Sequence, residues 1–522
     1  MSFKFQINEN IKFTRNKKFL EKAEESKTAL NYEKYKPVRC IEANSSTEIK
    51  NVNHQIEDLH SKQFGRDDSI ILDFGEHHVG RFSIDINRIG SMMDAPLTIK
   101  FQFAEISSEL LSNPNEYDGW LSRSWIPIET FHIDELPCKL HLPRRYSFRY
   151  VKITVIDTSP KWKIELNNPI VEAQSAISNR ELSNMELSGS TQSLQNIEKV
   201  SLKTLAECMQ DVFEDGPKRD QRLWLGDLHL QALANYSTFK KNSLVKRCLY
   251  LFAGMTTEDG KVSANIFTSK DEVPDDTFLL DYSLFFVSTL KDYLKNTQDQ
   301  ETVRELYPTA KKQIDLALAC VNGDGKLMIP DEWPSFIDWG DGFDKITATQ
   351  GVLIYVLKDF LELSKDLMIE VDDEYNKKLQ LLSDYSRKKL YDSSRQLFIS
   401  GEKAELNIYS QVWMILAGVF PENIEKSIML ATYKKFFPIK NIETPYMYHY
   451  VVTALLKANM RAEAINLIND YWGSMIINGA DTFWEAYKPD EPNFSPYGSS
   501  LVNSYCHAWS CTPVYLINKY RL

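Results

Sequence analysis

The chain has 522 residues, of which 43% are apolar and 25% charged, and its formal net charge is -11. One hydrophobic core rarely grows beyond roughly 250–300 residues, so the length predicts two domains. The acidic balance argues against nucleic acid and anionic membranes as partners, because both attract basic surfaces. The most apolar helical run, 278–294, is interrupted by Asp281 and Lys291, so we expect no membrane span.

The cysteines and the N-terminus indicate the cellular compartment. Seven cysteines are scattered along the chain without a CxxC pair, so neither a zinc site nor a disulfide framework is predicted. The first residues contain no apolar segment typical of a secretory signal. We therefore expect a cytoplasmic protein in a reducing environment, with no metal and no cofactor.

Residues 1–175 are predicted to form the first domain. Stretches 69–74, 80–86, 97–103 and 148–156 mix alternating apolar residues with β-branched and aromatic ones, which is typical of strands. Turn-forming clusters separate these stretches. The pattern predicts an antiparallel β-sandwich. The adjacent His77 and His78 have no partner at metal-ligand spacing, and we expect them at a surface strand end.

Residues 176–522 are predicted to form a second, helical domain. Apolar spacing indicates twelve helices, near 193–208, 227–239, 242–255, 277–296, 299–320, 345–367, 372–391, 408–419, 422–435, 445–458, 460–474 and 500–519. Six helical hairpins closing into an (α/α)6 barrel are the economical arrangement. A helical solenoid is the alternative, although no repeat of fixed period is present. Four long connections, 209–226, 256–276, 321–344 and 475–499, would then gather at one end and line a cleft.

The first long connection contains the densest polar cluster of the chain. Residues 215–227 read DGPKRDQRLWLGD, with three acids, two arginines and a tryptophan. Gly216 and Pro217 interrupt any helix, so the acids are expected on a loop, with Asp227 as the N-cap of the next helix. Carboxylates, arginines and an aromatic ring on one loop suit a site that grips a sugar and protonates an oxygen. A capped turn with a solvated charge cluster is the simpler interpretation.

Two further loops contain candidate site residues. Glu485 lies between Trp484 and Tyr487, and a carboxylate among aromatic rings has restricted hydration and suits an acid or base. In loop 321–344, Trp333, Asp338 and Trp339 are candidates for stacking on a sugar ring and binding its hydroxyls. Nucleotide, zinc-protease and serine-hydrolase motifs are absent from the sequence. An acid pair in a cleft remains, as in glycoside hydrolysis.

At this point the chain resembles the α-L-rhamnosidases of glycoside hydrolase family 78, over most of its length. The resemblance includes LDFGE and VGR within 72–81, FIDW at 336–339, TFWE at 482–485, and the C-terminal segment with His507. Residues 215–227 are similar to the family signature D-C-P-x-R-E-x-L-G-W-x-G-D. The C-terminal β-domain of many members has no counterpart in this sequence, which therefore resembles a short form.

The resemblance implies an inverting, exo-acting enzyme with Asp220 as general acid and Glu485 as general base. It also implies that rhamnose is held by Asp215, Arg219, Trp224, Asp227, Trp339 and His507. The family acid is commonly glutamate, and shifting the alignment by one residue would place Gln221 there. Asp220 is preferred because the acid must titrate.

Three functions stay open on the sequence. The first is hydrolysis of small rhamnosides, such as disaccharides or glycosylated plant phenolics. The second is another (α/α)6 glycosidase, such as an unsaturated uronide hydrolase, which would need cationic groups for a carboxylated sugar. The third is a carbohydrate-binding protein with a decayed site, a hypothesis that Gln221 keeps alive. A homodimer is the expectation from oligomer frequencies alone.

Overall fold

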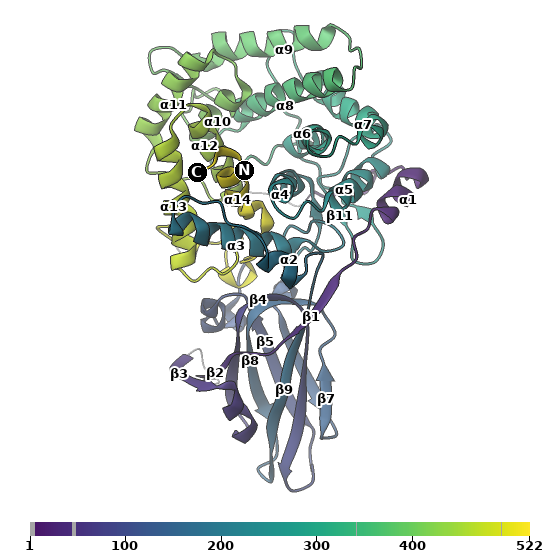
Figure 1. The fold of residues 1–522 in the computed structure, drawn as a ribbon, viewed down its shortest axis with the longest axis vertical. Coiled ribbons are helices and arrows are strands. Elements are labelled where there is room, and N and C mark those ends of the chain that lie inside the picture. Colours follow the sequence, from purple (N-terminus) through teal and green to yellow (C-terminus); the bar gives the residue numbers. More distant parts are fainter. Residues whose placement is uncertain (1–5, 44–48, 341, 492) are drawn as a thin grey trace.

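The computed structural model describes residues 6–43, 49–340, 342–491 and 493–522. Strands occupy the N-terminal part of the chain and helices most of the remainder. Figure 1 shows the two regions one above the other, with the long strands below and the helices above. The change from strand-like to helix-like periodicity in the sequence therefore corresponds to a change of architecture.

Strand β4 (Ser69–Gly90) organises the sheet region because it pairs with several partners along its length. Its first part pairs with β2 (Arg39–Ala43) and β8 (Tyr146–Asp157), and its second part with β7 (Cys138–His141) and β9 (Trp162–Ser175). The pairing with β8 is irregular between Asp73 and His78, where β4 begins to change partners.

Within the described ranges, nine strands join in one antiparallel sheet. The path runs β1 (Asn31–Tyr35), β9, β4, β8, β5 (Leu97–Ala104), β6 (Ile128–Ile133), with β2, β3 (Ile49–Gln55) and β7 attached beside it. The antiparallel prediction is confirmed. The sheet encloses a core of its own, in which Phe82, Phe101 and Phe148 are fully buried or nearly so.

The helical region contains one helix close to each of the first eleven predicted positions. The helices are α3 (Gln192–Cys208), α4 (Leu225–Ser237), α5 (Asn242–Gly254), α6 (Leu280–Thr297), α7 (Gln300–Ala319), α8 (Ile346–Asp366), α9 (Glu374–Tyr385), α10 (Ile408–Ala417), α11 (Glu422–Phe436), α12 (Pro445–Lys457) and α13 (Arg461–Ile477). The apolar periodicity thus located these helices to within a few residues.

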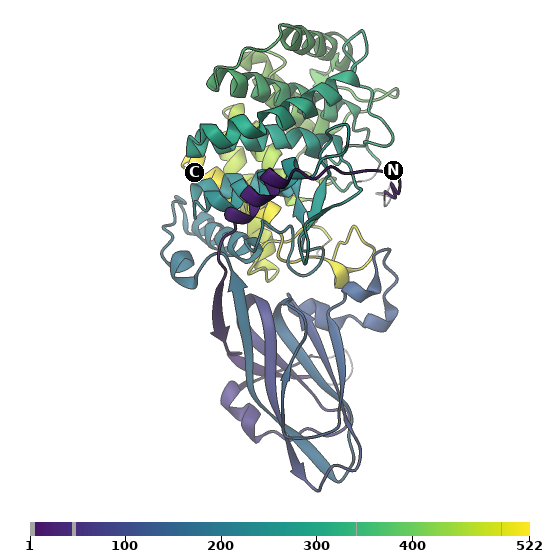
Figure 2. The ribbon, with the colours of Figure 1, turned by 90° about the vertical axis from the view of Figure 1, so that its right-hand side faces the viewer.

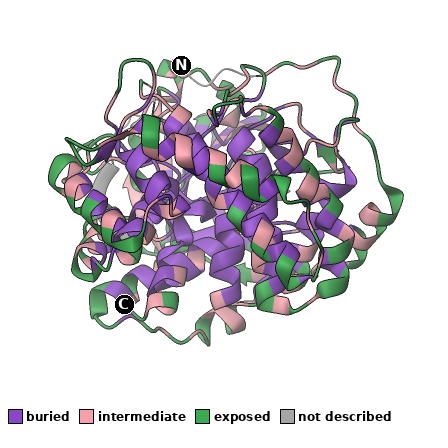
Figure 3. Cartoon of the chain, turned by 90° about the horizontal axis from the view of Figure 1, so that it is seen from above, coloured by how far each residue is buried: buried purple, intermediate pink, exposed green. Residues whose placement is uncertain are grey.

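Alternate helices touch one another in a closed series. Helix α4 contacts α6, α6 contacts α8, α8 contacts α10, and α10 contacts α12. Helix α12 contacts the short 3-10 helix η7 (Ala508–Cys511), which contacts α4 again. Helices α4, α10 and α12 are buried over most of their residues, whereas α9, α11 and α13 are buried on one side only. Figure 3 shows buried residues gathered towards the centre of the molecule and exposed ones around it.

Two parts of the chain differ from the prediction. The segment 500–519 is not one helix, because an extended stretch separates η6 (Ser500–Val502) from η7, and α14 (Pro513–Tyr520) follows. Near the N-terminus, α1 (Lys17–Glu25) packs against α5 and so belongs spatially with the helices rather than the sheet (Figure 1). The short helix α2 (Asn179–Ser183) connects the two regions.

Across the described ranges, the helices all fall short of the length and apolar character needed to cross a lipid bilayer.

Candidate active site

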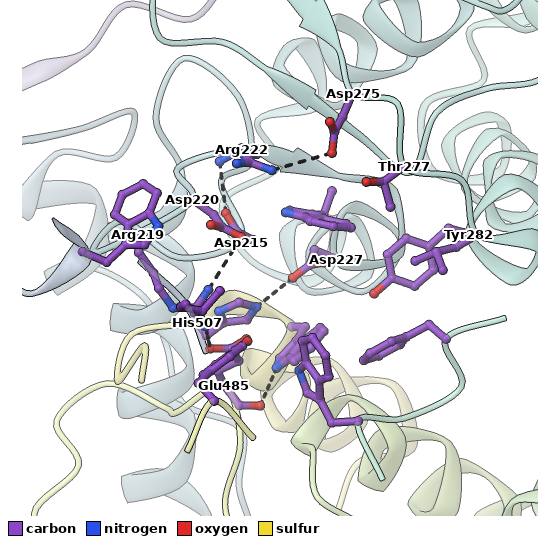
Figure 4. A pocket seen from close by; sticks show the side chains of 18 of the residues that line it. Asp215, Arg219, Asp220, Arg222, Asp227, Asp275, Thr277, Tyr282, Glu485 and His507 are labelled. Carbon is purple, nitrogen blue, oxygen red and sulfur yellow. Dashed lines mark hydrogen bonds and ion pairs between the residues drawn. The ribbon is translucent and has the colours of Figure 1, made fainter. Parts of the chain in front are cut away.

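Four long loops meet at one end of the helical region and enclose a cavity of about 190 Å³. They precede α4, α6, α8 and the C-terminal helices, and a segment from the sheet region completes the wall. Figure 4 shows the acidic and basic side chains pointing towards one another in this cavity. The lining consists of Trp120, Leu121, Ser122, Trp125, Asp215, Arg219, Asp220, Arg222, Trp224, Asp227, Asp275, Thr277, Leu279, Tyr282, Phe336, Trp339, Glu485, Tyr497, His507 and Trp509.

Short strands shape the loop 215–227. Strand β10 (Leu223–Trp224) pairs with β11 (Asn265–Phe267), which pairs with β12 (Val273–Pro274), so the first two long loops lie side by side. Two hydrogen bonds between Asp215 and Arg222 hold the ends of this loop together. The Asp215 amide donates to the Arg222 carbonyl (3.0 Å), and the Asp215 carboxylate accepts from the Arg222 amide (3.0 Å). At the tip of the loop, Asp220 and Gln221 both have left-handed backbone conformations, with φ of 61° and 53°.

Glu485 is a buried carboxylate held on both oxygens. Its Oε2 forms an ion pair with Arg219, and its Oε1 accepts a hydrogen bond from the Tyr497 hydroxyl. Burial favours the neutral acid, but the nearby positive charge of Arg219 and the hydrogen bonds outweigh it, so the pKa of Glu485 is lowered. Its main-chain carbonyl also accepts from the Trp509 indole at 2.9 Å. Glu485 is therefore ionised at neutral pH and fixed in orientation.

Arg219 stands between the two candidate catalytic carboxylates. Its Nη2 contacts Glu485, and its Nη1 lies 3.6 Å from Oδ2 of Asp220. Its Nε donates to the Val502 carbonyl at 2.7 Å, and its guanidinium lies 4.2 Å from the centre of the Tyr497 ring. The two carboxylates are thus separated by a guanidinium group, and Asp220 keeps part of its side chain exposed to the cavity.

Two more acids, Asp215 and Asp227, lie buried beside Asp220 and Glu485. Asp227 lies in the first turn of α4 rather than at the predicted N-cap, and its Oδ1 is 3.0 Å from Nε2 of His507. Burial raises the pKa of Asp227, while the hydrogen bond with His507 opposes the rise. Burial also raises the pKa of Asp215 well above its ordinary value, and the carboxylates of Asp220 and Asp227 raise it further. These groups can both donate and accept hydrogen bonds, which suits the binding of sugar hydroxyls.

A buried charge network lies beneath the loop and joins it to the sheet region. Lys218 forms an ion pair with Glu109 and donates to the Asn503 carbonyl at 2.8 Å. Glu105 accepts from the amide of Tyr505 (2.6 Å) and lies 3.2 Å from Nε2 of His77. The expectation that His77 and His78 lie at the surface was wrong, because both are buried in the contact between sheet and helices.

The structure brings together eight of the ten predicted site residues in the cavity lining. Trp333 and Asp338 lie outside this lining. Asp338 is buried and accepts hydrogen bonds from the hydroxyls of Tyr409 (2.9 Å) and Thr444 (2.6 Å), and from a main-chain amide. Trp333 is also buried, with the Lys261 ammonium 4.5 Å from its ring centre. Both residues stabilise the loop 321–344, which presents Phe336 and Trp339 to the cavity.

Sequence reasoning missed several lining residues. Trp120 and Trp125 come from the connection between β5 and β6, in the sheet region, and no local pattern indicated that this connection reaches the helices. Tyr497 lies in the fourth long loop, after Glu485. This shared loop is the one feature of the sequence that could have indicated Tyr497 as a lining residue. Arg222, one of the two arginines of residues 215–227, also lines the cavity, and its Nη1 lies 3.7 Å from Oδ2 of Asp275.

The side chains of this cavity are of the kinds that acid and base catalysis on a hydroxylated ligand uses. One ionised carboxylate, one partly exposed carboxyl and several buried hydrogen-bonding groups surround a space with aromatic walls. Such an arrangement suits a glycoside hydrolase.

Comparison with known proteins gives the family. Residues 39–173 match the N-terminal domain of glycosyl hydrolase family 78 α-rhamnosidases, and residues 183–520 match the bacterial α-L-rhamnosidase six-hairpin glycosidase domain. The comparison with curated proteins gave no match.

Three solved structures are similar to this chain. A rhamnosidase from Klebsiella oxytoca with rhamnose bound is 42% identical, with a TM-score of 0.93, covering 98% of this chain and 100% of that one. The family 78 rhamnosidase of Bacillus sp. GL1 is 22% identical (TM-score 0.71; 87% of this chain, 46% of that one). The Streptomyces avermitilis α-L-rhamnosidase complexed with L-rhamnose is 13% identical (TM-score 0.67; 94% and 44%). The last two show similarity of fold alone.

The fold and the cavity define a glycoside hydrolase. The chain belongs to glycoside hydrolase family 78, the family of α-L-rhamnosidases, as its sequence motifs had indicated.

Proposed function

We propose that this protein is an inverting, exo-acting α-L-rhamnosidase that releases terminal α-L-rhamnose from small rhamnosides. Asp220 would be the general acid and Glu485 the general base. The observation that best supports this assignment is the position of Arg219, which contacts Glu485 through one amino group and approaches Asp220 through the other. An inverting mechanism would need the two carboxyls to stand roughly 6.5–9.5 Å apart, with a water molecule beside the base.

The proposed reaction gives each carboxyl one role. Asp220, as the general acid, would donate its proton to the glycosidic oxygen as the bond to the anomeric carbon breaks. Glu485, ionised because its pKa is lowered, takes a proton from a water that attacks the same carbon from the opposite face. After the reaction Asp220 has lost a proton and Glu485 has gained one. Proton exchange with solvent returns both groups to their starting states.

The remaining cavity residues would hold the sugar. Asp215, Asp227 and His507 provide buried donors and acceptors for ring hydroxyls. Trp224 and Trp339 provide apolar surface for the C6 methyl group of rhamnose, a feature that distinguishes it from most hexoses. The rhamnose bound in the Klebsiella oxytoca relative supports this choice of sugar.

A carboxylated substrate is less well supported. Arg219 is already paired with Glu485, and Arg222 lies beside Asp275, so both arginines of the main motif have acidic neighbours. A uronide hydrolase would need cationic groups directed at its substrate.

We also propose the finer architecture, an (α/α)6 barrel in which α4, α6, α8, α10 and α12 form most of the inner ring. The closed series of contacts between these alternate helices supports it. The boundary between residues 175 and 176, the cytoplasmic location and the homodimer stay predictions.

The test of the function is hydrolysis of p-nitrophenyl α-L-rhamnopyranoside by the purified protein, with the anomer of the released sugar followed by NMR. We expect the β-anomer first, and loss of turnover in both Asp220→Asn and Glu485→Gln. Asp331→Asn, which changes an exposed aspartate of loop 321–344, is the matched control and should retain activity. Normal turnover by either variant would exclude that residue from its assigned role.

A further inference from the structure

The connection between β5 and β6, residues 105–127, leaves the sheet and docks on the loop that precedes η6. It contains the short helices η2 (Ser107–Leu111) and η4 (Arg123–Trp125), and Figure 2 shows it reaching up beside the C-terminal loop. The Trp120 amide donates to the Tyr497 carbonyl (3.2 Å), and the Trp120 indole nitrogen donates to the Pro496 carbonyl (3.0 Å). A side chain at Gly119 would meet the Tyr497 carbonyl at 2.7 Å, so the approach of the two loops requires glycine there.

This docking builds an aromatic wall on one side of the cavity. Trp120, Tyr497 and Trp339 follow one another, with ring centres 5.5 Å apart in each neighbouring pair. Trp120 is 41% exposed although its indole nitrogen is hydrogen-bonded, so much of its accessible surface is apolar ring. Trp120 and Trp125 both line the cavity that contains Glu485. An exposed tryptophan held by two hydrogen bonds in a cavity is a preformed stacking surface.

The wall differs chemically from the opposite side of the cavity. The acids and His507 are provided by loops of the helical region, whereas the residues 120–125 that line the cavity offer two tryptophans, a leucine and one serine. The Ser122 hydroxyl already accepts from the Ser124 amide, at 3.3 Å. A sugar in this position would find an aromatic face but few hydrogen-bonding partners for its hydroxyls. A flat apolar ring covers the same face with a larger apolar contact and needs no such partners.

We infer that residues 120–125 form the subsite for the leaving group, and that this subsite takes a planar aromatic aglycone stacked on Trp120. The inference rests on the proposed rhamnosidase function, which assigns the polar side of the cavity to rhamnose. Part of the specificity would then be supplied by the sheet region rather than by the helices.

The test compares three rhamnosides: p-nitrophenyl α-L-rhamnoside, methyl α-L-rhamnoside and a rhamnosyl-glucose disaccharide. Removing a stacked ring costs up to about tenfold in kcat/KM. We expect Trp120→Ala to lower kcat/KM on the aryl substrate roughly tenfold, and on the other two by no more than about twofold. Trp120→Phe should recover most of the loss. Tyr32→Ala, which removes an exposed aromatic ring of the sheet region outside the cavity, is the control and should match wild type.

Inhibition by free L-rhamnose separates the possible outcomes. Its inhibition constant should be the same in wild type and Trp120→Ala, because none of the residues proposed to hold rhamnose belongs to the segment 120–125. Equal losses on all three substrates, with weaker inhibition by rhamnose, would mean that Trp120 only supports the fold of the site and would overturn the subsite. Equal losses on the aryl and disaccharide substrates would overturn the preference for an aromatic ring. A wild type that hydrolyses none of the three and is folded would refute the rhamnosidase function itself.

Discussion

Tyr497→Phe tests how the charge of the candidate base is maintained. The hydroxyl of Tyr497 donates to Oε1 of Glu485, and a donor of this kind stabilises the ionised carboxylate. Burial raises the pKa of Tyr497 well above its ordinary value, so it remains a donor throughout the working range of pH. Phenylalanine keeps the ring that contacts Arg219 and Trp339 and removes only the hydroxyl.

The size and sign of the effect follow from the hydrogen bond. A hydrogen bond to a charged group contributes about 1.5–3 kcal/mol. Its loss removes that stabilisation from the ionised form and so raises the pKa of Glu485. The base works only when ionised, so the acidic limb of the kcat/KM profile moves to higher pH.

The assay is a pH profile of kcat/KM on the aryl rhamnoside, with samples quenched in base before reading. Circular dichroism at each pH confirms that the variant is folded. An acidic limb that does not move in a folded variant would refute the reasoning. A uniform loss of activity at every pH would instead assign Tyr497 to support of the loop.

Two further predictions concern stability and packing. Lys218→Met leaves the buried Glu109 carboxyl, whose pKa burial raises to about 7, without its ammonium partner. Urea denaturation above that pH should show the free energy of unfolding lowered by up to about 3–5 kcal/mol; adding Glu109→Gln should restore most of it, and an additive double variant would contradict the pairing. Gly226→Ala should cost about 1–3 kcal/mol and raise KM, since the new methyl would lie 2.3 Å from the buried Tyr282 ring that lines the cavity. Unchanged melting temperature and KM would show that the ring has room to move.

The helices were predictable because their burial follows the helical period. The segment 500–519 was not, because contacts distant in sequence determine its backbone. The Tyr505 amide donates to Glu105, and the His507 amide donates to the Phe483 carbonyl at 2.9 Å. These partners hold an extended path through residues that would otherwise suit a helix, so local periodicity was overridden by tertiary hydrogen bonds.

The candidate site was predictable only in part, for a similar reason. Asp338 has the composition and loop position of a ligand-binding acid, yet its oxygens are occupied by Tyr409 and Thr444. Trp120 belongs to a connection between two strands, and only the folded chain reveals that this connection crosses to the helical region. The sequence can indicate which residue types suit the chemistry. It cannot indicate which of these side chains are already engaged in structural hydrogen bonds.

The charge network under the loop 215–227 has a consequence for exchanging the N-terminal part of this protein for that of another. Lys218 belongs to the helical half and Glu109 to the sheet half, and each is almost fully hidden from solvent. A chimaera that joins these helices to a foreign sheet would leave the Lys218 ammonium group buried without an acidic partner, beneath the candidate catalytic residues. Exchange of the N-terminal part should therefore succeed only when the donor supplies the matching acid. The sheet region and the helical region can then be exchanged only together or as a matched pair.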